Sequence, residues 1–553
     1  MLLLRTLVVV LLTALLVPAT IVAQVAFTQI SLTGTQVPAV DDEAEFSFFD
    51  APSLNASGDV AFRAGIRTGA EPELSESEAI FGPTSGAGSS LGLIAREGDL
   101  APGLDSGEVF SFLDAPTLNA SGDVAFLAVL RTDVLVDDDF SNSLTIFGPT
   151  SGAGSSLGLI AREGDPLPGA ADEDETIIDI LNPPSLNAAG DVAFLADLRT
   201  EPAFDEGFGI DSAILGPTMG AGSPLGVIAR TNALAPGTDE AVFDFFTGSP
   251  WLNASGDVAF SAFLFAGLGP EFGPEFGDGP VLNLNDAGLF GPTSGAGSSL
   301  GLIAQPGDPA PGTDDSAAFD FIFDTPSIND SGDVAFNAFL RTGTGADVSD
   351  SNAGAIFGPT FGAGSSLGPI ARADEPAPGV DDDAEFDFFF DTPSLNAQGD
   401  VAFLAILRSG TDDEEEEVNE NIDSALYVSV AGQLQLIVRN GDPFTVTLPD
   451  GSDTQERIIS AIDMSPTGLN DAGMLAFSLT FTDDTQGIFT AVPASNTEPL
   501  LGDVDLSGVV NFLDIGPFIL LLSTGEFQAE ADIDQSGTVD FLDISPFIAI
   551  LAG

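Results

Sequence analysis

Short apolar runs alternate with turn-forming clusters along most of the chain, and the alternation is periodic. The clearest unit is the stretch 54–62, Leu-Asn-Ala-Ser-Gly-Asp-Val-Ala-Phe, which recurs unchanged at 118–126 and 252–260. Variants of it occur at 186–194, 328–336, 395–403 and, most degraded, 469–477. The leading Asn recurs every 64 to 76 residues, and self-similarity at such a period indicates a repeat architecture.

The motif itself predicts a tight turn between two strands. Asn and Gly accept positive φ, and an Asn side chain can bond the backbone two residues further on. Asn-x-x-Gly-Asp between apolar runs is therefore typical of a hairpin, and we favour this over a ligand-binding role for the Asn or Asp. The segment that follows, 60–67, is rich in β-forming residues.

Each repeat contains three further candidate strands. In the first repeat these are 52–54 before the turn, then 79–81, and finally 91–96 after the Gly-rich loop 82–90. An acidic loop then leads to the next repeat. Four short antiparallel strands, repeated seven times, predict an all-β fold with a seven-bladed β-propeller.

The two ends of the repeat region predict how the ring closes. The seventh repeat ends after its third strand, 487–489, and residues 30–39 align with the missing fourth strand and its turn. We expect this N-terminal strand to complete the last blade, because closure removes an exposed sheet edge. An open solenoid or a row of sandwiches would not need this permutation, and these remain the alternatives.

The loops of such a propeller separate into two faces. The motif turns and the Gly-rich loops scarcely vary and share one face, whereas the other loops vary in length and carry acid, as at 71–78, 137–139 and 412–417. Variable loops on a rigid scaffold are where binding concentrates, so the acidic face could hold a cation, glycan or protein ligand. The Gly-rich loop lacks the Lys and the following helix of a phosphate-binding loop.

Composition excludes several function classes. The net charge is −72, which repels nucleic acid and anionic lipid. The absence of Cys and His excludes thiol chemistry, disulfides and a histidine base. All 13 basic residues are Arg, and most stand at two repeated strand ends, where we expect them to pair with repeated Asp residues between blades.

The N-terminus has the features of a signal peptide, residues 1–23. Arg5 precedes an apolar run, 7–17, and small residues lead to a cleavage site near Ala23. The run is short for a bilayer-spanning helix, and no membrane span is expected elsewhere. The sequence thus predicts a secreted or cell-surface protein with a propeller at 24–493, a linker at 494–500 and a further domain at 501–553.

Two 12-residue loops, 503–514 and 532–543, have the spacing of calcium sites. Ca²⁺ takes six to eight oxygen ligands, and such loops supply them from positions 1, 3, 5, 7, 9 and 12 with Gly at 6. Here the metal-ligating positions are Asp503, Asp505, Ser507, Val509 (carbonyl), Asn511, Asp514, Asp532, Asp534, Ser536, Thr538 (carbonyl), Asp540 and Asp543. We predict two Ca²⁺ ions, each followed by a helix, 515–522 or 544–551; an acidic turn without an ion is the alternative.

This tandem arrangement resembles the dockerin family over 501–553. The resemblance implies a small α-helical, calcium-dependent module that binds a cohesin-like partner through positions 10 and 11 of each loop. These are Phe512, Leu513, Phe541 and Leu542, in place of the usual small hydroxyl pair. Their identity in both loops would permit two opposite binding orientations. The repeats resemble planctomycete-like bacterial surface proteins with tandem Asn-x-x-Gly-x-x-Ala-Phe units, which implies architecture and localisation only.

Two functions remain. The first is an exported, non-enzymatic propeller displayed or docked on a surface or extracellular complex through the calcium-dependent module. The alternative is a propeller carbohydrate-active enzyme for polysaccharide degradation, delivered by its dockerin, because paired carboxylates suffice for glycoside hydrolysis. One Trp and one Tyr leave few aromatic platforms for sugars, so we favour the first.

Overall fold

The structure is a computed structural model. It describes residues 25–38, 40, 44–69, 75–104, 107–131, 144–169, 176–200, 211–238, 240–265, 287–313, 317–341, 354–380, 384–408, 423–451, 453–493, 502, 504, 515–524, 531, 533 and 538–552. The predicted signal peptide and linker therefore lie outside the described residues. One compact unit spans Val25–Pro493, and the two helices belong to a second unit.

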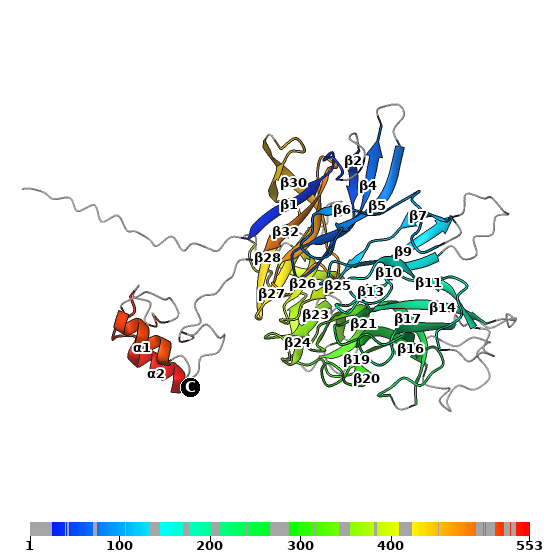
Figure 1. Ribbon diagram of the computed structural model, residues 1–553. Coiled ribbons are helices and arrows are strands. Elements are labelled where there is room, and N and C mark those ends of the chain that lie inside the picture. Colours follow the sequence, from blue (N-terminus) through cyan, green and yellow to red (C-terminus); the bar gives the residue numbers. More distant parts are fainter. Residues whose placement is uncertain are drawn as a thin grey trace, which may run out of the picture. The chain divides into compact units, whose positions relative to one another are not determined.

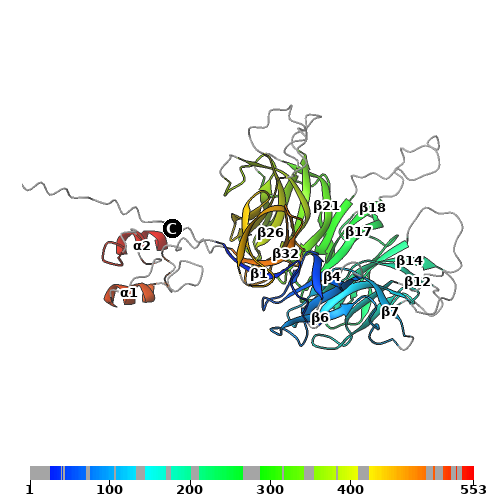
Figure 2. The same ribbon diagram turned by 90° about the horizontal axis from the view of Figure 1, so that it is seen from above.

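The first unit consists of seven antiparallel sheets, which confirms the predicted seven-bladed β-propeller (Figures 1 and 2). In six of the sheets the strands lie in chain order, as a meander, and in the seventh β1 is added beside β32. The second strands follow the motif turns and are β4 (Val60–Thr68), β9 (Val124–Arg131), β14 (Val192–Thr200), β18 (Val258–Phe265), β22 (Val334–Arg341), β26 (Val401–Arg408) and β31 (Leu475–Phe481).

The third and fourth strands of each sheet match the repeat pattern. The third strands are β5 (Ser75–Pro83), β10 (Leu144–Pro149), β15 (Asp211–Pro217), β19 (Ala287–Pro292), β23 (Gly354–Pro359), β27 (Ser424–Val430) and β32 (Gln486–Val492). The fourth strands are β6 (Leu91–Arg96), β11 (Leu157–Arg162), β16 (Leu225–Arg230), β20 (Leu300–Ala304), β24 (Leu367–Arg372), β28 (Gln433–Arg439) and β1 (Ala26–Leu32).

The first strands are longer than the sequence predicted. Much of the expected acidic loop is strand, because its Phe residues enter the core between acidic or small polar residues. In β2 the buried side chains are Phe46 and Phe49, three residues apart because the strand bulges between Phe46 and Phe48. In three sheets this segment is separate, giving β2 (Glu45–Phe49) with β3 (Ser53–Leu54), β7 (Val109–Leu113) with β8 (Thr117–Leu118), and β12 (Thr176–Leu181) with β13 (Ser185–Leu186). In the others it is continuous or extended: β17 (Val242–Leu252), β21 (Ala318–Ile328), β25 (Glu385–Leu395) and β30 (Thr454–Asp463) with β29 (Pro443–Thr447).

The N-terminal strand completes the seventh sheet, as the repeat register predicted. β1 pairs antiparallel with β32, and the two lie side by side in Figure 1 as the blue and orange ends of the ring. The Gln29 side chain adds two hydrogen bonds to the Thr447 backbone, at 2.9 Å from Nε2 to the carbonyl and 2.8 Å from the N–H to Oε1. Sheet edges far apart in sequence are thus paired, and the ring is closed.

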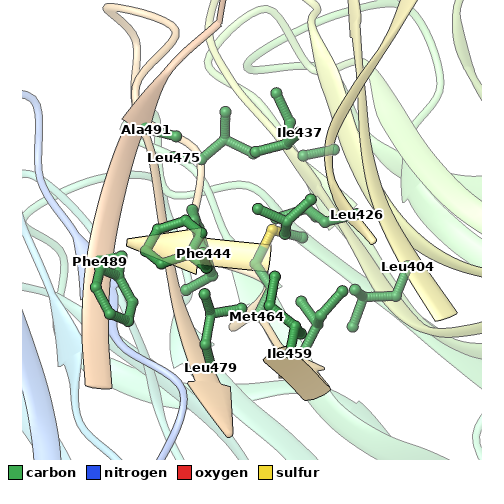
Figure 3. Packing of buried hydrophobic residues seen from close by; sticks show 14 of the residues in the cluster. Leu404, Leu426, Ile437, Phe444, Ile459, Met464, Leu475, Leu479, Phe489 and Ala491 are labelled. Atoms are coloured by element: carbon green, nitrogen blue, oxygen red, sulfur yellow. The ribbon is translucent and has the colours of Figure 1, made fainter. Parts of the chain in front are cut away.

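The core of the propeller lies between blades. Each of seven apolar clusters combines residues of two neighbouring sheets, and together they cover all seven junctions of the ring. The largest joins the sixth and seventh sheets, where Leu404 and Leu426 face Ile459 and Met464 (Figure 3). Second and third strands are buried on both faces, which explains their nearly continuous apolar sequences.

Aromatic contacts hold the strands of most blades in register. Phe126 of β9 stacks on Phe147 of β10 with ring centroids 5.7 Å apart, and Phe110 of β7 meets Phe147 edge-on at 5.1 Å. In the seventh sheet the edge-on partner of Phe489 is Phe444, which comes from β29. The strand β29 thus brings an aromatic side chain into the last blade.

The second unit contains α1 (Ile515–Thr524) and α2 (Ile544–Ala552). Phe518 and Phe547, one on each helix, stack with ring centroids 4.1 Å apart and form a small core with Ile533 and Val539. Among the described residues no helix has the length and apolar character needed to cross a bilayer.

Candidate functional site

The motif turn is held by its own Asn. In the second sheet Asn119 Oδ1 accepts the N–H groups of Ser121 and Asp123, both at 2.9 Å, and Asn119 Nδ2 donates to the Asp123 carboxylate at 3.0 Å. Gly122 sits at a φ of +82°, with no room for a Cβ against the backbone of Gly86. These contacts confirm the predicted hairpin and give both polar side chains a structural role.

Six of the seven motif Asn side chains also join neighbouring blades. Each of these donates from Nδ2 to the carbonyl of the equivalent Asn in the next sheet, at 2.8 to 3.2 Å; the donors are Asn119, Asn187, Asn253, Asn329, Asn396 and Asn470. The last of these bonds reaches Asn55 and crosses the closure between the seventh and first sheets. We call this arrangement the Asn ring.

The Gly-rich loops are linked to the same turns. The N–H of Gly154 donates to the Asp123 carboxylate of its own blade at 2.8 Å, and the N–H of Ala153 donates to the Ala189 carbonyl of the next blade, also at 2.8 Å. A third N–H, that of Ser151, is taken by Ser155 Oγ. Because its amides are already engaged within the fold, the loop is no phosphate cradle.

A cavity opens at the centre of the Asn ring, and sequence reasoning missed it. Its lining comes from all seven motif turns, including Ala56, Ala120 and Ala188, so it lies on the axis of the propeller. Trp251, the single Trp of the chain, also lines it, in a position that carries Ser or Thr in five of the other repeats and Gly468 in the seventh. We call it the axial cavity; the only sequence signal for it was this one departure from the repeat.

A group of aspartates lies within or next to the first strands of adjacent blades. Asp50, Asp114 and Asp391 stand four residues before the motif Leu or its equivalent and Asp463 stands six before it, and the four come from consecutive sheets. Burial raises the pKa of Asp463, and the charges of Asp391 and Asp50 raise it further. Burial also raises the pKa of Asp114, where Asp50 adds to the effect while a hydrogen bond from the Ala115 N–H and the Arg63 charge oppose it.

Arg63 is the cation placed among these carboxylates. It bonds Asp50 at 2.6 Å and Glu78 at 2.7 Å, and its guanidinium carbon lies 5.2 Å from the ring centre of Phe112 in the next blade. The equivalent residue in other repeats is Leu, Ser or Asn, so this Arg is specific to the first blade.

The repeated Arg residues pair differently from the prediction. Arg230 bonds Asp211 at 2.6 Å and Arg439 bonds Asp423 at 2.5 Å, each within one sheet. The pairs of Arg67, Arg162, Arg199 and Arg341 are likewise within a sheet. These pairs differ from the expected pairs between blades, because the strand ends that bear the Arg lie beside acidic residues of the same sheet. Arg408 agrees with the expectation, since it bonds Asp374, on the turn after β24 of the preceding sheet, at 2.5 Å.

Of the predicted calcium ligands, the structure describes three, all in the second loop. Asp543 is fully buried just before α2, and its Oδ2 accepts the N–H of Asp540 at 2.8 Å. Asp540 Oδ1 accepts the N–H of Leu542 at 2.7 Å. Thr538 lies at the start of this segment. The carboxylate of Asp543 is thus turned back into the loop, as a position-12 ligand requires, and hard carboxylate oxygens are the donors that Ca²⁺ takes.

The other predicted ligands lie outside the described residues, and among the described residues no group of three acidic side chains is gathered for a metal. Outside them too are Asp503, Asp505, Ser507, Val509, Asn511, Asp514, Asp532, Asp534 and Ser536, together with Phe512 and Leu513. The acidic loops 137–139 and 412–417 also lie outside, whereas Ser75–Glu78 of the loop predicted at 71–78 belongs to β5.

Large apolar side chains are exposed in the described part of the second unit. Phe541 is 80% exposed and Leu542 is 68% exposed. Ile519 of α1 and Ile548 of α2, at equivalent positions of the two repeats, are 58% and 59% exposed. We call these four residues the apolar surface of the second unit.

Comparison with known proteins adds a family but no function. No curated protein matches the chain. One family matches residues 38–499, which includes the motif repeats and ends before the two calcium-type loops. This match covers most of the chain, and the protein therefore belongs to DUF7453, a family of unknown function.

Proposed function

We propose that this protein is an exported, non-enzymatic propeller that docks on a surface or extracellular complex through a calcium-dependent, dockerin-like C-terminal module. The observation that carries the proposal is the apolar surface of the second unit. Single exposed apolar residues are ordinary, but large ones gathered on a small unit are typical of protein interaction sites.

Duplication supports the same conclusion. Ile519 and Ile548 have nearly equal exposure, and Phe518 and Phe547 form the shared core, so the helices of the two halves are equivalent at these positions. A partner of cohesin type would then meet similar side chains in either of two orientations. Aromatic and aliphatic anchors at the centre of an interface supply most of its binding energy.

Calcium has a structural role in this proposal. Each ion would be held by the oxygens of one 12-residue loop, with Asp540 and Asp543 among the ligands of the second. A buried carboxylate is costly unless it is paired or coordinated, and Asp543 is fully buried. The ion would fix the loop against its helix and so keep Phe541 and Leu542 in place for the partner.

The test uses the full mature chain. After chelation, calorimetric titration with Ca²⁺ should show two sites, and Asp503→Ala or Asp532→Ala should each remove one. Pull-down with a panel of bacterial cohesin modules should recover a partner with calcium and lose it with chelator. Binding that is indifferent to chelator would contradict the proposal.

A matched pair of variants distinguishes specific docking from non-specific hydrophobic binding. Phe541→Ser with Leu542→Ser should abolish partner recovery, whereas Met219→Ser, at an exposed propeller loop, should leave it unchanged. Release of reducing sugar from polysaccharides by the wild-type chain would instead support the alternative, a carbohydrate-active enzyme.

A further inference from the structure

We infer that the axial cavity binds a small ligand bearing a carboxylate, through backbone N–H groups of consecutive motif turns. The inference goes beyond the docking function and does not depend on it. It starts from an interaction that the protein makes with itself at two places around the Asn ring.

At these two places a carboxylate of one blade caps the turn of the preceding blade. The N–H of Ala254 donates to Asp330 Oδ1 at 2.8 Å, and the N–H of Ala397 donates to Asp471 Oδ1 at 2.9 Å. Both acceptors occupy the residue directly after the ring Asn of the following repeat. The geometry of the turn therefore aims this N–H at a carboxylate-sized space beside the next turn.

The same donors are open in the first three blades. There the following repeat has Ala at the acceptor position, so the N–H groups of Ala56, Ala120 and Ala188 meet no carboxylate. No hydrogen bond in the described part of the chain engages these three N–H groups. All three residues are exposed and line the axial cavity.

A ligand carboxylate can take the place that Asp330 and Asp471 fill elsewhere. Hydrogen bonds from backbone N–H groups to an ionised acceptor are short and stronger than neutral ones. Three adjacent donors favour a ligand with more than one acceptor oxygen. The net charge of −72 opposes the approach of any anion, so the affinity should rise with added salt as that repulsion is screened.

Trp251 provides the measurement, because it lines the same cavity and is the only Trp. Calcium-saturated full chain is titrated with glutarate, with glutaramide as the uncharged analogue, and with digalacturonate to distinguish a sugar-borne carboxylate from a free one. We expect a saturable change in Trp251 fluorescence with at least one acid, none with glutaramide, and tighter binding at higher salt.

Two variants add or remove the carboxylates that accept these turn N–H groups. Ala120→Asp with Ala188→Asp would cap the N–H groups of Ala56 and Ala120 and should weaken acid binding by about tenfold or more. Asp330→Ala would leave the N–H of Ala254 without its acceptor, beside the open N–H groups of the first three blades, and should strengthen acid binding. Ser85→Asp with Ser151→Asp adds the same charge on exposed loops of that face and should change binding little.

Each result either supports or overturns carboxylate binding in the axial cavity. The inference is overturned if neither wild type nor Asp330→Ala shows a saturable acid response, or if the capped variant responds like wild type. Should the capped variant fail to fold, amide hydrogen exchange of wild type decides instead: the acid should slow exchange at Ala56, Ala120 and Ala188, and unchanged exchange would refute it.

Discussion

The propeller and the C-terminal unit treat their apolar residues in opposite ways. Between the blades Phe62, Phe126 and Phe194 are completely buried, and seven clusters close every junction. In the C-terminal unit Phe541 and Ile548 stay largely exposed around a core of few residues. The propeller therefore buries its large apolar side chains within the ring, whereas the described part of the small unit has few buried residues to stabilise it and leaves large ones exposed.

The variant with the largest expected effect opens the ring and tests how much of the propeller's stability depends on its closure. A variant lacking residues 25–33 loses the ladder with β32 and the Gln29 clamp on Thr447. The seventh sheet would gain a bare edge, and the loss should approach the whole stability of an ordinary domain, about 5–15 kcal/mol. Thermal melting and limited proteolysis measure it.

The matching control is truncation after Pro493. Because the propeller core contains no residue of the second unit, its melting temperature should not change. A peptide of residues 25–36, added to the shortened ring, should restore part of the stability. Unaltered melting of the shortened ring would show that closure contributes little.

The second test removes one member of the Asn ring. Asn187→Ala leaves the N–H groups of Ala189 and Asp191 without their acceptor and breaks the bond to the next blade. Unsatisfied buried donors cost about 1–3 kcal/mol each, so we expect a loss of about 2–4 kcal/mol in chemical denaturation. Asn232→Ala, outside the motif, serves as the control. An equal loss of unfolding free energy in both variants would show that the Asn ring makes no particular contribution to stability.

The third test addresses the C-terminal unit. Calcium at about one hundred times its dissociation constant should stabilise that unit by about 2.7 kcal/mol, seen as a calcium-dependent melting step. Truncation after Pro493 should abolish the step without moving the main transition. A shift of the main transition on adding calcium would place an ion in the propeller instead.

The smallest expected effect is a pH dependence from the aspartates within or next to the first strands. Burial and neighbouring carboxylates raise the pKa of Asp463, and burial raises that of Asp114. The folded protein then holds these protons to a higher pH than the unfolded chain does, so stability falls as the pH rises above the ordinary value of about 4. Asp463→Asn and Asp114→Asn should each flatten this fall.

The control for that slope is Asp453→Asn, which removes the same charge from an exposed hairpin. Denaturation midpoints across the acidic range provide the measurement. If Asp453→Asn flattens the slope as much as Asp463→Asn does, overall charge and not the group of aspartates governs the pH dependence.

The repeat register could be predicted because it depends on local chemistry. The Asn and Gly of each motif favour a turn. Because the last repeat lacks its fourth strand, the sequence also predicted that β1 would pair with β32. The first strands were only partly predicted, since acidic residues in segments such as β2 and β25 suggested a loop while Phe46 and Phe386 were already facing the core.

The candidate sites likewise divide into those that local sequence predicts and those that distant residues form together. Calcium-type loops are recognisable from spacing alone. The Asn ring, the caps by Asp330 and Asp471 and the axial cavity come from residues more than 60 positions apart, and only the closed ring brings them together. Pairing of Arg230 with Asp211 was missed because a repeat pattern does not say which of two neighbouring sheets supplies the partner.

Closure by β1 also sets the order of assembly. The strand made first finds its partner β32 only after some 450 further residues exist, and contacts so distant in sequence form slowly. Until then the growing chain carries an unfinished sheet at each end, which invites pairing with another copy. Folding of this protein thus favours a late step that locks the whole ring over completion of one blade after another, and a chaperone that holds the chain would matter most just before β32 is synthesised.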